Sequence, residues 1–353
     1  MKSSFYKHSY AELTELFAQN GLPAVGANVL YNWHYKRNKT EVCRDKLAKT
    51  TIKFLEDNFS FDLPKIDRVQ QSCDKTVKFL MELADGLKVE TVLIPFNQKY
   101  TICLSSQVGC AMNCSFCFTG TQGLKRNLTT DEIVGQFLKA QSWLTLNRAD
   151  DDRILNIVFM GQGEPLHNFD AVKSACEIFL ANNGLCLATA KITISTSGYL
   201  PGLKRWKQEM SDVNIALSLH SPIEEKRNEL IPINRKYPLV EVLDLVDAIP
   251  HGKNRFVTYE YLLVKDFNDS ELDAHTTGEL LKGKKAYINL IPFNPYPGTK
   301  YQRPTDDVVA KFKYILSGYD IPTLVRTTKG DAILAACGQL NSSIQLCASI
   351  NNN

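Results

Sequence analysis

Apolar and polar residues follow one another with a spacing that changes along this 353-residue chain. Near its start, apolar side chains recur every three to four residues, as they do on the buried face of an amphipathic helix. This spacing predicts helices over residues 10–17, 27–35 and 47–57. A Leu-Pro-Lys linker is expected at 63–65, because proline interrupts regular structure. Residues 1–68 are therefore expected to form a small helical accessory domain.

Apolar and polar residues alternate in the next region. It covers residues 76–83 and 87–94, and this period of two is typical of half-buried strands. Asp85 and Gly86 stand between the two runs, and Asp-Gly is a frequent two-residue turn of a β-hairpin. The pattern predicts a β-hairpin extension over residues 69–98.

From residue 100 onward, predicted strands alternate with predicted helices. The predicted strands are 100–105, 154–160, 191–197, 213–220, 255–264, 286–293 and 323–328. Among the helices predicted between them are 131–140, 170–181, 240–249 and 306–316. Alternating strands and helices build parallel sheets, and a run this long indicates an α/β fold with an open or closed barrel. We expect the barrel core over 99–345 and a tail over 346–353.

Composition and charge exclude several protein classes. The net charge is only +3, so the chain as a whole is not a polycation. No apolar run approaches the roughly 18 residues of a membrane helix, and the first residues lead into no secretory signal. A cytoplasmic protein is expected, with its cysteines reduced and without a disulfide framework. The default expectation for its oligomeric state is a monomer.

One segment of the accessory region is strongly basic. Residues 33–53 hold seven lysines and arginines against two acidic residues, and aromatic rings lie within or just before them. Basic side chains beside exposed rings suit nucleic acid, whose phosphates give affinity and whose bases stack. The alternative is a solvated helix face whose rings are turned into the core. The segment alone slightly favours this alternative.

Three cysteines within eight residues restrict the chemistry more than any other feature: Cys110-Ala-Met-Asn-Cys114-Ser-Phe-Cys117. Thiolates suit iron–sulfur clusters, zinc or copper(I). Closed structural sites use four ligands, and this run supplies three. A four-iron cluster bound in this way keeps one iron open, as cleavage of S-adenosylmethionine (SAM) into a radical requires. A zinc site completed by a distant His or Cys, and three inert buried cysteines, are the alternatives.

Small and polar residues recur where the predicted strands end. Barrels of this kind gather their chemistry at the carboxyl ends of the strands, where such residues let a ligand approach the backbone. The segments concerned are 161–165, 195–198, 218–221 and 294–295. The cysteine run follows the first barrel strand. Each segment alone is a weak indication, and their recurrence beside the cysteines favours a functional site.

The cysteine spacing, with Gly163-Glu164-Pro165 after the second strand, resembles the radical SAM superfamily. More specifically, the chain resembles the RlmN/Cfr family of rRNA adenine methyltransferases. The matching blocks, in order, are 90–95, 103–110, the cysteine loop, 160–165, 195–198, 218–221, 291–295 and 335–340. The resemblance implies a partial (β/α) barrel of the radical SAM type. Its accessory domain would contact RNA, although we find no sharp motif there.

The resemblance also implies a cofactor site. Cys110, Cys114 and Cys117 would hold a [4Fe–4S] cluster whose open iron takes the amino and carboxylate groups of SAM. Gly163 and Glu164 would contact SAM near its methionyl amine. The pocket would be completed by Ser195, Ser218, Leu219, His220 and Asn294. An electron donor such as flavodoxin would reduce the cluster.

Two further cysteines and a carboxylate gain roles only through the resemblance. Cys337 would accept a methyl group from a first SAM, and a second SAM would yield the 5′-deoxyadenosyl radical that abstracts hydrogen from it. The methylene radical would add to adenine, and Cys103 would release the adduct by forming a disulfide with Cys337. Glu90 would accept a proton. The physical reason is that a ring C–H carbon of adenine is not nucleophilic, and covalent carriers divide one hard step into easier ones.

Within the family, two products compete. Housekeeping members methylate carbon 2 of an adenine in 23S rRNA, and some also modify a tRNA anticodon-loop adenine; resistance-conferring members methylate carbon 8. Val108 and the segments 93–95 and 163–165 resemble the housekeeping type, whereas Gln162 and Phe118 are less typical. Carbon 2 is therefore the prediction. A radical SAM enzyme acting on a small molecule, and a zinc-dependent RNA-binding module, are the alternatives from other classes.

Overall fold

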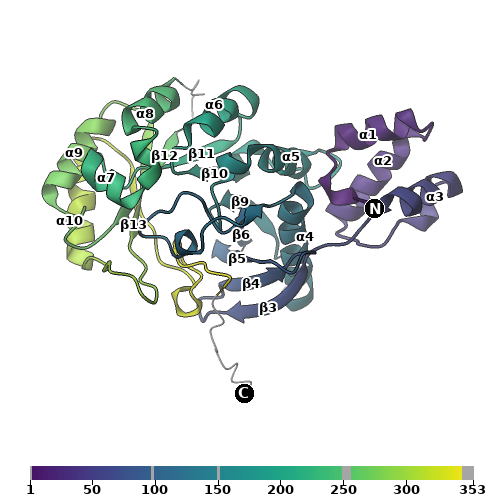
Figure 1. The fold of residues 1–353 in the computed structure, drawn as a ribbon, viewed down its shortest axis with the longest axis horizontal. Coiled ribbons are helices and arrows are strands. Elements are labelled where there is room, and N and C mark those ends of the chain that lie inside the picture. Colours follow the sequence, from purple (N-terminus) through teal and green to yellow (C-terminus); the bar gives the residue numbers. More distant parts are fainter. Residues whose placement is uncertain (1, 97–98, 149–151, 249–255, 344–353) are drawn as a thin grey trace, which may run out of the picture.

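The computed structural model describes residues 2–96, 99–148, 152–248 and 256–343. Within them, ten strands form one sheet in the order β14-β13-β12-β11-β10-β9-β6-β5-β4-β3 (Figure 1). The strands are β3 (Lys65–Gln71), β4 (Val77–Glu82), β5 (Lys88–Phe96), β6 (Lys99–Cys103), β9 (Ile154–Phe159), β10 (Ile192–Thr196), β11 (Asn214–Ser218), β12 (Val257–Leu263), β13 (Ala286–Pro292) and β14 (Thr323–Val325).

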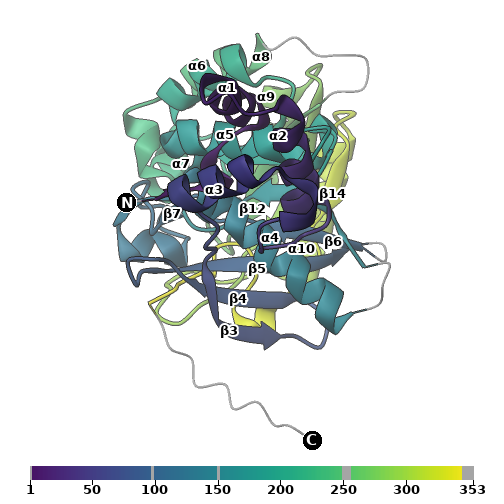
Figure 2. The same ribbon diagram turned by 90° about the vertical axis from the view of Figure 1, so that its right-hand side faces the viewer.

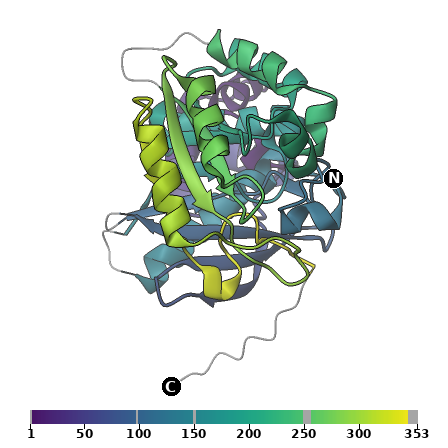
Figure 3. The ribbon, with the colours of Figure 1, turned by 90° about the vertical axis from the view of Figure 1, so that its left-hand side faces the viewer.

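The strands from β6 to β14 form the parallel part of this sheet, as the alternating pattern predicted. The helices between and after them are α4 (Thr130–Asn147), α5 (Phe169–Leu180), α6 (Leu200–Glu209), α7 (Glu224–Leu230), α8 (Leu239–Asp247), α9 (Glu271–Leu281) and α10 (Asp306–Ser317). They cover the outer face of the strands, and Figure 3 shows α9 and α10 side by side in green and yellow-green. Because β14 and β6 do not pair, the barrel is open, and the expected partial α/β barrel is confirmed.

Buried aliphatic and aromatic side chains fill the space between the strands and these helices. Capping hydrogen bonds fix the residue at which a helix begins. Thr129 and Glu132 form a capping box at the start of α4, where the Thr129 N–H donates to the Glu132 carboxylate at 2.9 Å. None of the helices in the described part of the chain has the length and apolar character that a membrane crossing requires.

The antiparallel part is larger than the predicted hairpin. Strands β4 and β5 form that hairpin, β5 continues the sheet by pairing with β6, and β3 adds a third strand at the outer edge (Figure 2). The sequence predicted a linker at 63–65 and missed β3, in which most side chains are polar. Every side chain of this edge strand is exposed or half-buried, so few apolar residues are needed, and charged residues on an edge oppose pairing with another chain. The expected boundary between residues 68 and 69 falls inside this strand.

The accessory region contains α1 (Tyr10–Gln19), α2 (Ala24–Tyr31) and α3 (Lys49–Asn58), drawn in purple and blue in Figure 1. Tyr31, His34 and Tyr35 are buried in its core, where they contact Phe5. The interpretation that the rings belong to the core is therefore confirmed for these three, whereas Trp33 is half-buried and donates from Nε1 to the carbonyl of Glu41 at 2.7 Å. The basic side chains of the segment are exposed: Lys36, Arg37, Lys39, Arg44, Lys46, Lys49 and Lys53.

Parts of four predictions lie outside the described residues. These parts are the end of the helix predicted over 240–249, the start of the strand predicted over 255–264, the last two residues of the hairpin region, and the chain beyond residue 343. The strand predicted over 323–328 is shorter than expected, since β14 ends at Val325. Arg326 therefore belongs to a loop at the carboxyl end of the sheet.

Candidate active site

An open cavity lies at the carboxyl ends of the parallel strands, as the barrel predicts. Its empty space is about 910 Å³, with the open mouth included. Loops after β6, β9, β10 and β11 line it, together with a loop from the end of the described chain. It gathers nine of the predicted site residues: Cys110, Cys114, Cys117, Gly163, Glu164, Ser195, Ser218, His220 and Cys337. Leu219, Asn294, Cys103 and Glu90 do not line it.

The three cysteines of the run are held by local backbone structure. The N–H of Cys117 donates to the carbonyl of Cys114 at 3.1 Å, and that of Cys110 donates to the carbonyl of Gly123 at 3.2 Å. Gly109 has a φ of +75°, and a Cβ built there would lie 1.8 Å from the Gly123 carbonyl oxygen. Glycine is therefore required at the start of the loop.

The three cysteines of this loop are half-buried, and their thiols would ionise only with a positively charged group bound to them. Burial raises the pKa of Cys110 to about 12, and it also raises the pKa of Cys114 and of Cys117. Within the described residues, no three His, Cys, Asp or Glu side chains converge as the ligands of a single metal ion do. The thiols nevertheless share one cavity, and the charges of Cys110 and Cys117 act on Cys114. Bound metal would stabilise all three as thiolates.

Glu164 is a buried carboxylate that links the ends of β9 and β10. Its Oε2 accepts hydrogen bonds from the N–H and hydroxyl of Ser197 at 2.8 and 2.9 Å, and its Oε1 accepts one from the N–H of Leu166 at 3.1 Å. Burial raises its pKa, and the Ser197 hydrogen bonds oppose that rise. At Gly163, φ is +102°, and an added Cβ would lie 2.5 Å from Cβ of Gln107. Only glycine fits there.

Arg227 supports the ends of β10 and β11, and no sequence pattern pointed to it. Its guanidinium is fully buried and donates to the carbonyls of Ser197, Ser218 and Leu219. Burial lowers its pKa to about 10, while the charge of Cys114 raises it. In the sequence it follows Glu-Glu-Lys, a run typical of an exposed helix face. Leu219 therefore contributes its backbone to this edge, and its side chain is buried.

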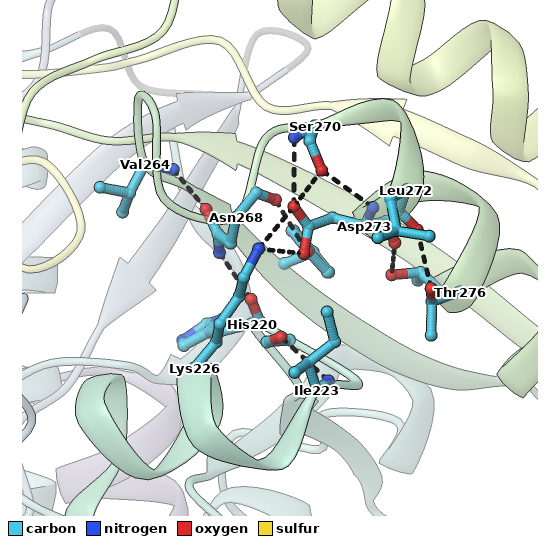
Figure 4. Close-up of polar contacts among 12 residues, drawn as sticks. His220, Ile223, Lys226, Val264, Asn268, Ser270, Leu272, Asp273 and Thr276 are labelled. Atoms are coloured by element: carbon cyan, nitrogen blue, oxygen red, sulfur yellow. Dashed lines mark hydrogen bonds and ion pairs between the residues drawn. The ribbon is translucent and has the colours of Figure 1, made fainter.

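A network behind the cavity holds His220 in place (Figure 4). His220 has a φ of +57°, and Asn268 donates from Nδ2 to its carbonyl at 2.6 Å and to that of Leu262 at 2.7 Å. Beside it, Asp273 accepts two hydrogen bonds from Lys226, at 2.7 and 2.8 Å. Burial lowers the pKa of His220 to about 3, so its ring is neutral.

Cys103 and Cys337 meet at a smaller cavity that adjoins the large one, although they lie far apart in the sequence. Both are free thiols; Cys103 is buried, and Cys337 is half-buried and borders both cavities. Asn294 also borders the smaller cavity, and its Nδ2 donates to the carbonyl of Cys337 at 3.2 Å. It therefore holds the Cys337 loop and does not face the large cavity.

Glu90 lies on the other side of that loop, in the antiparallel part of the sheet. Its Oε1 is 2.9 Å from Nζ of Lys78, and both side chains are 6% exposed. Lys78 also donates to the carbonyl of Leu334 at 3.1 Å. Burial raises the pKa of Glu90, and the charge of Lys78 opposes that rise. The structure thus places Glu90 beneath the Cys337 loop, at a small cavity that it shares with Leu334 and Gln339 of that loop.

Comparison with known proteins agrees with this architecture. Residues 104–276 match the model of the radical SAM superfamily. The dual-specificity RNA methyltransferase RlmN of Rhodopseudomonas palustris strain BisB5 is 43% identical, over 98% of this chain and 90% of that protein. The protein of the same name from Granulibacter bethesdensis is 40% identical, over 95% of this chain and 86% of its own length.

A solved structure extends the agreement to the whole fold. The crystal structure of a radical SAM methyltransferase from Sphaerobacter thermophilus superposes with a TM-score of 0.89, at 36% identity. It covers 96% of this chain and 99% of its own. Because of these similarities, we interpret the cysteine run as part of a radical SAM site and not of a zinc-dependent RNA-binding module. The chain is a SAM-dependent methyltransferase with a radical mechanism and belongs to the RlmN family of the radical SAM superfamily.

Proposed function

We propose that this enzyme methylates carbon 2 of an adenosine in 23S rRNA and of an adenosine in the tRNA anticodon loop, with Cys337 as the methyl carrier. The observation that supports it is the shared cavity of Cys337, the cysteine run and Glu164. The similarity to relatives named dual-specificity RNA methyltransferases supports the two RNA substrates. Their names do not distinguish carbon 2 from carbon 8, so that choice rests on the motifs.

Cys110, Cys114 and Cys117 are the proposed ligands of a [4Fe–4S] cluster. Three thiols on one side of an open cavity fit a cluster that keeps one iron accessible. When bound, the cluster and SAM would supply the radical chemistry. Glu164 would accept the amino group of SAM, because a buried carboxylate is a strong hydrogen-bond acceptor for a cation. The strand ends at Ser195, Ser218 and His220 would form the rest of the SAM pocket.

Cys337 and Cys103 have the positions that a carrier and a releasing thiol need. Cys337 borders the large cavity, so its sulfur can reach a sulfonium methyl group bound there. Cys103 borders only the smaller cavity behind it and is the thiol proposed to displace the RNA from Cys337 by forming a disulfide. The proposed carrier, Cys337, thus borders the cavity proposed to hold SAM, whereas the proposed releasing thiol, Cys103, borders the smaller cavity beside it.

Glu90 is the proposed proton acceptor for the adenine adduct. Its burial supports this role, since burial moves a carboxyl group toward the pKa range in which general bases work. Its position beneath the loop requires the substrate to approach from the side of the antiparallel strands. The exposed basic side chains of residues 36–53 are proposed to contact RNA phosphates.

The test is mass mapping of methylated adenine in rRNA and tRNA from cells with and without this gene. We expect 2-methyladenosine at one position of 23S rRNA and in the tRNA fraction, both lost when the gene is removed. If 8-methyladenosine is lost instead, the enzyme methylates carbon 8 and not carbon 2. An unchanged pattern of methylated adenines in both RNAs would reject the proposed substrates.

A further inference from the structure

A buried lysine without a role in the proposed function joins two parts of the proposed reaction site. Lys78 lies on β4, and its Nζ is 2.9 Å from Oε1 of Glu90 on the neighbouring strand β5. The same nitrogen donates to the carbonyl of Leu334 at 3.1 Å. Leu334 belongs to the Cys337 loop (residues 330–342), which lies against β4 and the turn before it (Figure 2, in yellow). One ammonium group thus contacts both the proposed proton acceptor and the loop of the proposed methyl carrier.

The carboxylate of Glu90 depends on this lysine. Within the described residues, Lys78 is the only cation that forms an ion pair with Glu90, and a buried charge needs such a partner. Burial raises the pKa of Glu90, and the charge of Lys78 and the N–H of Asn341 oppose that rise. The second oxygen, Oε2, is buried and has no hydrogen-bond partner of normal geometry in the described part of the chain. Lys78 therefore holds one oxygen of the carboxylate and leaves the other available to a proton.

The backbone of Glu90 is held by other residues. Its N–H donates to Oε1 of Gln162 at 3.1 Å, and its carbonyl accepts a hydrogen bond from the hydroxyl of Ser105 at 2.6 Å. Gln162 is fully buried after β9. Because its Oε1 must accept from an N–H, its Nε2 faces the hydroxyl of Ser342, to which it donates at 3.4 Å. Removal of Lys78 should therefore release the carboxylate of Glu90 and leave its strand in place.

The Cys337 loop also has anchors besides Lys78. The N–H of Phe118 donates to the carbonyl of Gly338 at 2.7 Å, directly beside the proposed carrier. Within the loop, Nε2 of Gln339 donates to the carboxylate of Asp331 at 2.7 Å. Without Lys78 the loop would keep these hydrogen bonds, whereas the buried carboxylate would lose its ion-pair partner. Loss of the lysine should therefore affect the proton acceptor more than the carrier.

We propose that Lys78 is a positioning residue that holds the carboxylate of Glu90 against the Cys337 loop, so that it meets the adenine attached to Cys337. This inference rests on the proposed function, in which Cys337 carries the RNA and Glu90 accepts a proton from it. Lys78 itself transfers no proton and contacts neither RNA nor SAM. Its contribution is the distance between acceptor and carrier, since a displacement of about 1 Å can slow a reaction about 100-fold.

The test separates two stages of the reaction in the full-length protein with its cluster, kept anaerobic. The first stage is methylation of Cys337 by SAM without reductant, measured by peptide mass spectrometry. The last stage is methylation of a 23S rRNA transcript with SAM and reductant, in which RNA still attached to Cys337 appears as a slower band on a denaturing gel. In Lys78→Met we expect the first rate to stay within about twofold, and the last to fall about tenfold while attached RNA accumulates.

Further variants separate this effect from a general change in the protein. Lys78→Arg keeps the cation and should restore most of the RNA methylation. Lys78→Gln keeps an N–H donor without the charge and should also accumulate attached RNA, so it serves as the test if Lys78→Met does not fold. The matched control is Lys88→Met. Lys88 on β5 is 2.9 Å from the carboxylate of Asp67 in an ion pair that is 31% exposed, and its removal should leave both rates unchanged.

Glu90→Gln distinguishes failure of this inference from failure of the proposed function. It should leave RNA attached to Cys337 and slow RNA methylation about 100-fold. The same block in Glu90→Gln, with normal RNA methylation in the Met and Gln variants of Lys78, would overturn the role of Lys78 and leave the proposed function intact. Equal losses at both stages in these variants would show a general structural role and overturn the inference as well. Normal RNA methylation in Glu90→Gln would overturn the proton acceptor itself.

Discussion

The two groups of cysteines in this enzyme are built in opposite ways. Cys110, Cys114 and Cys117 are close in sequence and are held by turns within their own loop. Cys103 and Cys337 come from a strand and from a distant loop, and the fold alone brings them to one cavity. Spacing therefore reveals the first group, and no local pattern reveals the second. Chemistry confined to one loop can be found by motif, whereas chemistry shared between distant segments requires a structure or a relative.

The two groups should fail differently when a cysteine is removed, and this is the largest effect that we expect. Cys114→Ala should lose iron and sulfide, and with them all cleavage of SAM. Cys337→Ala should keep the cluster, because the residue is not a proposed ligand, and should lose RNA methylation completely. The measurements are iron and sulfide content, release of 5′-deoxyadenosine, and methyl transfer to rRNA. RNA methylation that persists in Cys337→Ala would contradict the carrier mechanism.

The Cys337 loop also depends on a buried ion pair that the cysteine run does not need. Lys78→Met would leave the Glu90 carboxylate buried without its cation, and we expect the free energy of unfolding to fall by about 3 kcal/mol at neutral pH. Folding would then favour the protonated carboxyl, so the folded protein would bind more protons than the unfolded one. Stability should therefore decrease as the pH rises through the range in which carboxyl groups titrate.

Urea denaturation of Lys78→Met at about pH 5 and at about pH 7.5 measures this pH dependence. The matched control is the double variant Lys78→Met, Glu90→Gln, in which no charge is left buried and most of the pH dependence should disappear. Equal stability of the single variant at both pH values would show that the Glu90 charge is already compensated by other groups.

A smaller effect is expected on the side of the cysteine run. Arg227→Met would remove the donor to the carbonyls of Ser197, Ser218 and Leu219, and we expect a loss of about 2 kcal/mol in the free energy of unfolding. The affinity for SAM should fall as well, because these strand ends form the proposed pocket. Urea denaturation and equilibrium binding of SAM provide the two values. Arg205→Met is the control and should stay within about 0.5 kcal/mol of the unaltered protein.

The sequence predicted the parallel strands because each is a short apolar run between helical segments. It missed β3, whose side chains are mostly polar. It could not show that Glu90 pairs with Lys78 beneath the Cys337 loop, because the two residues lie on neighbouring strands and no local pattern joins them. Arg227 could not be found either. A buried arginine looks in sequence like an exposed one, since only the carbonyls that surround it in the fold distinguish the two.

The burial of Cys103 has a consequence for the order of events. Burial, with the charge of Cys337, raises its pKa to about 12, so at neutral pH the sulfur stays protonated. Such a thiol is a poor nucleophile and a poor target for peroxide. In the proposed mechanism, Cys103 would therefore stay unreactive until RNA is attached to Cys337. The burial of this sulfur atom on β6 would then set the order of the steps.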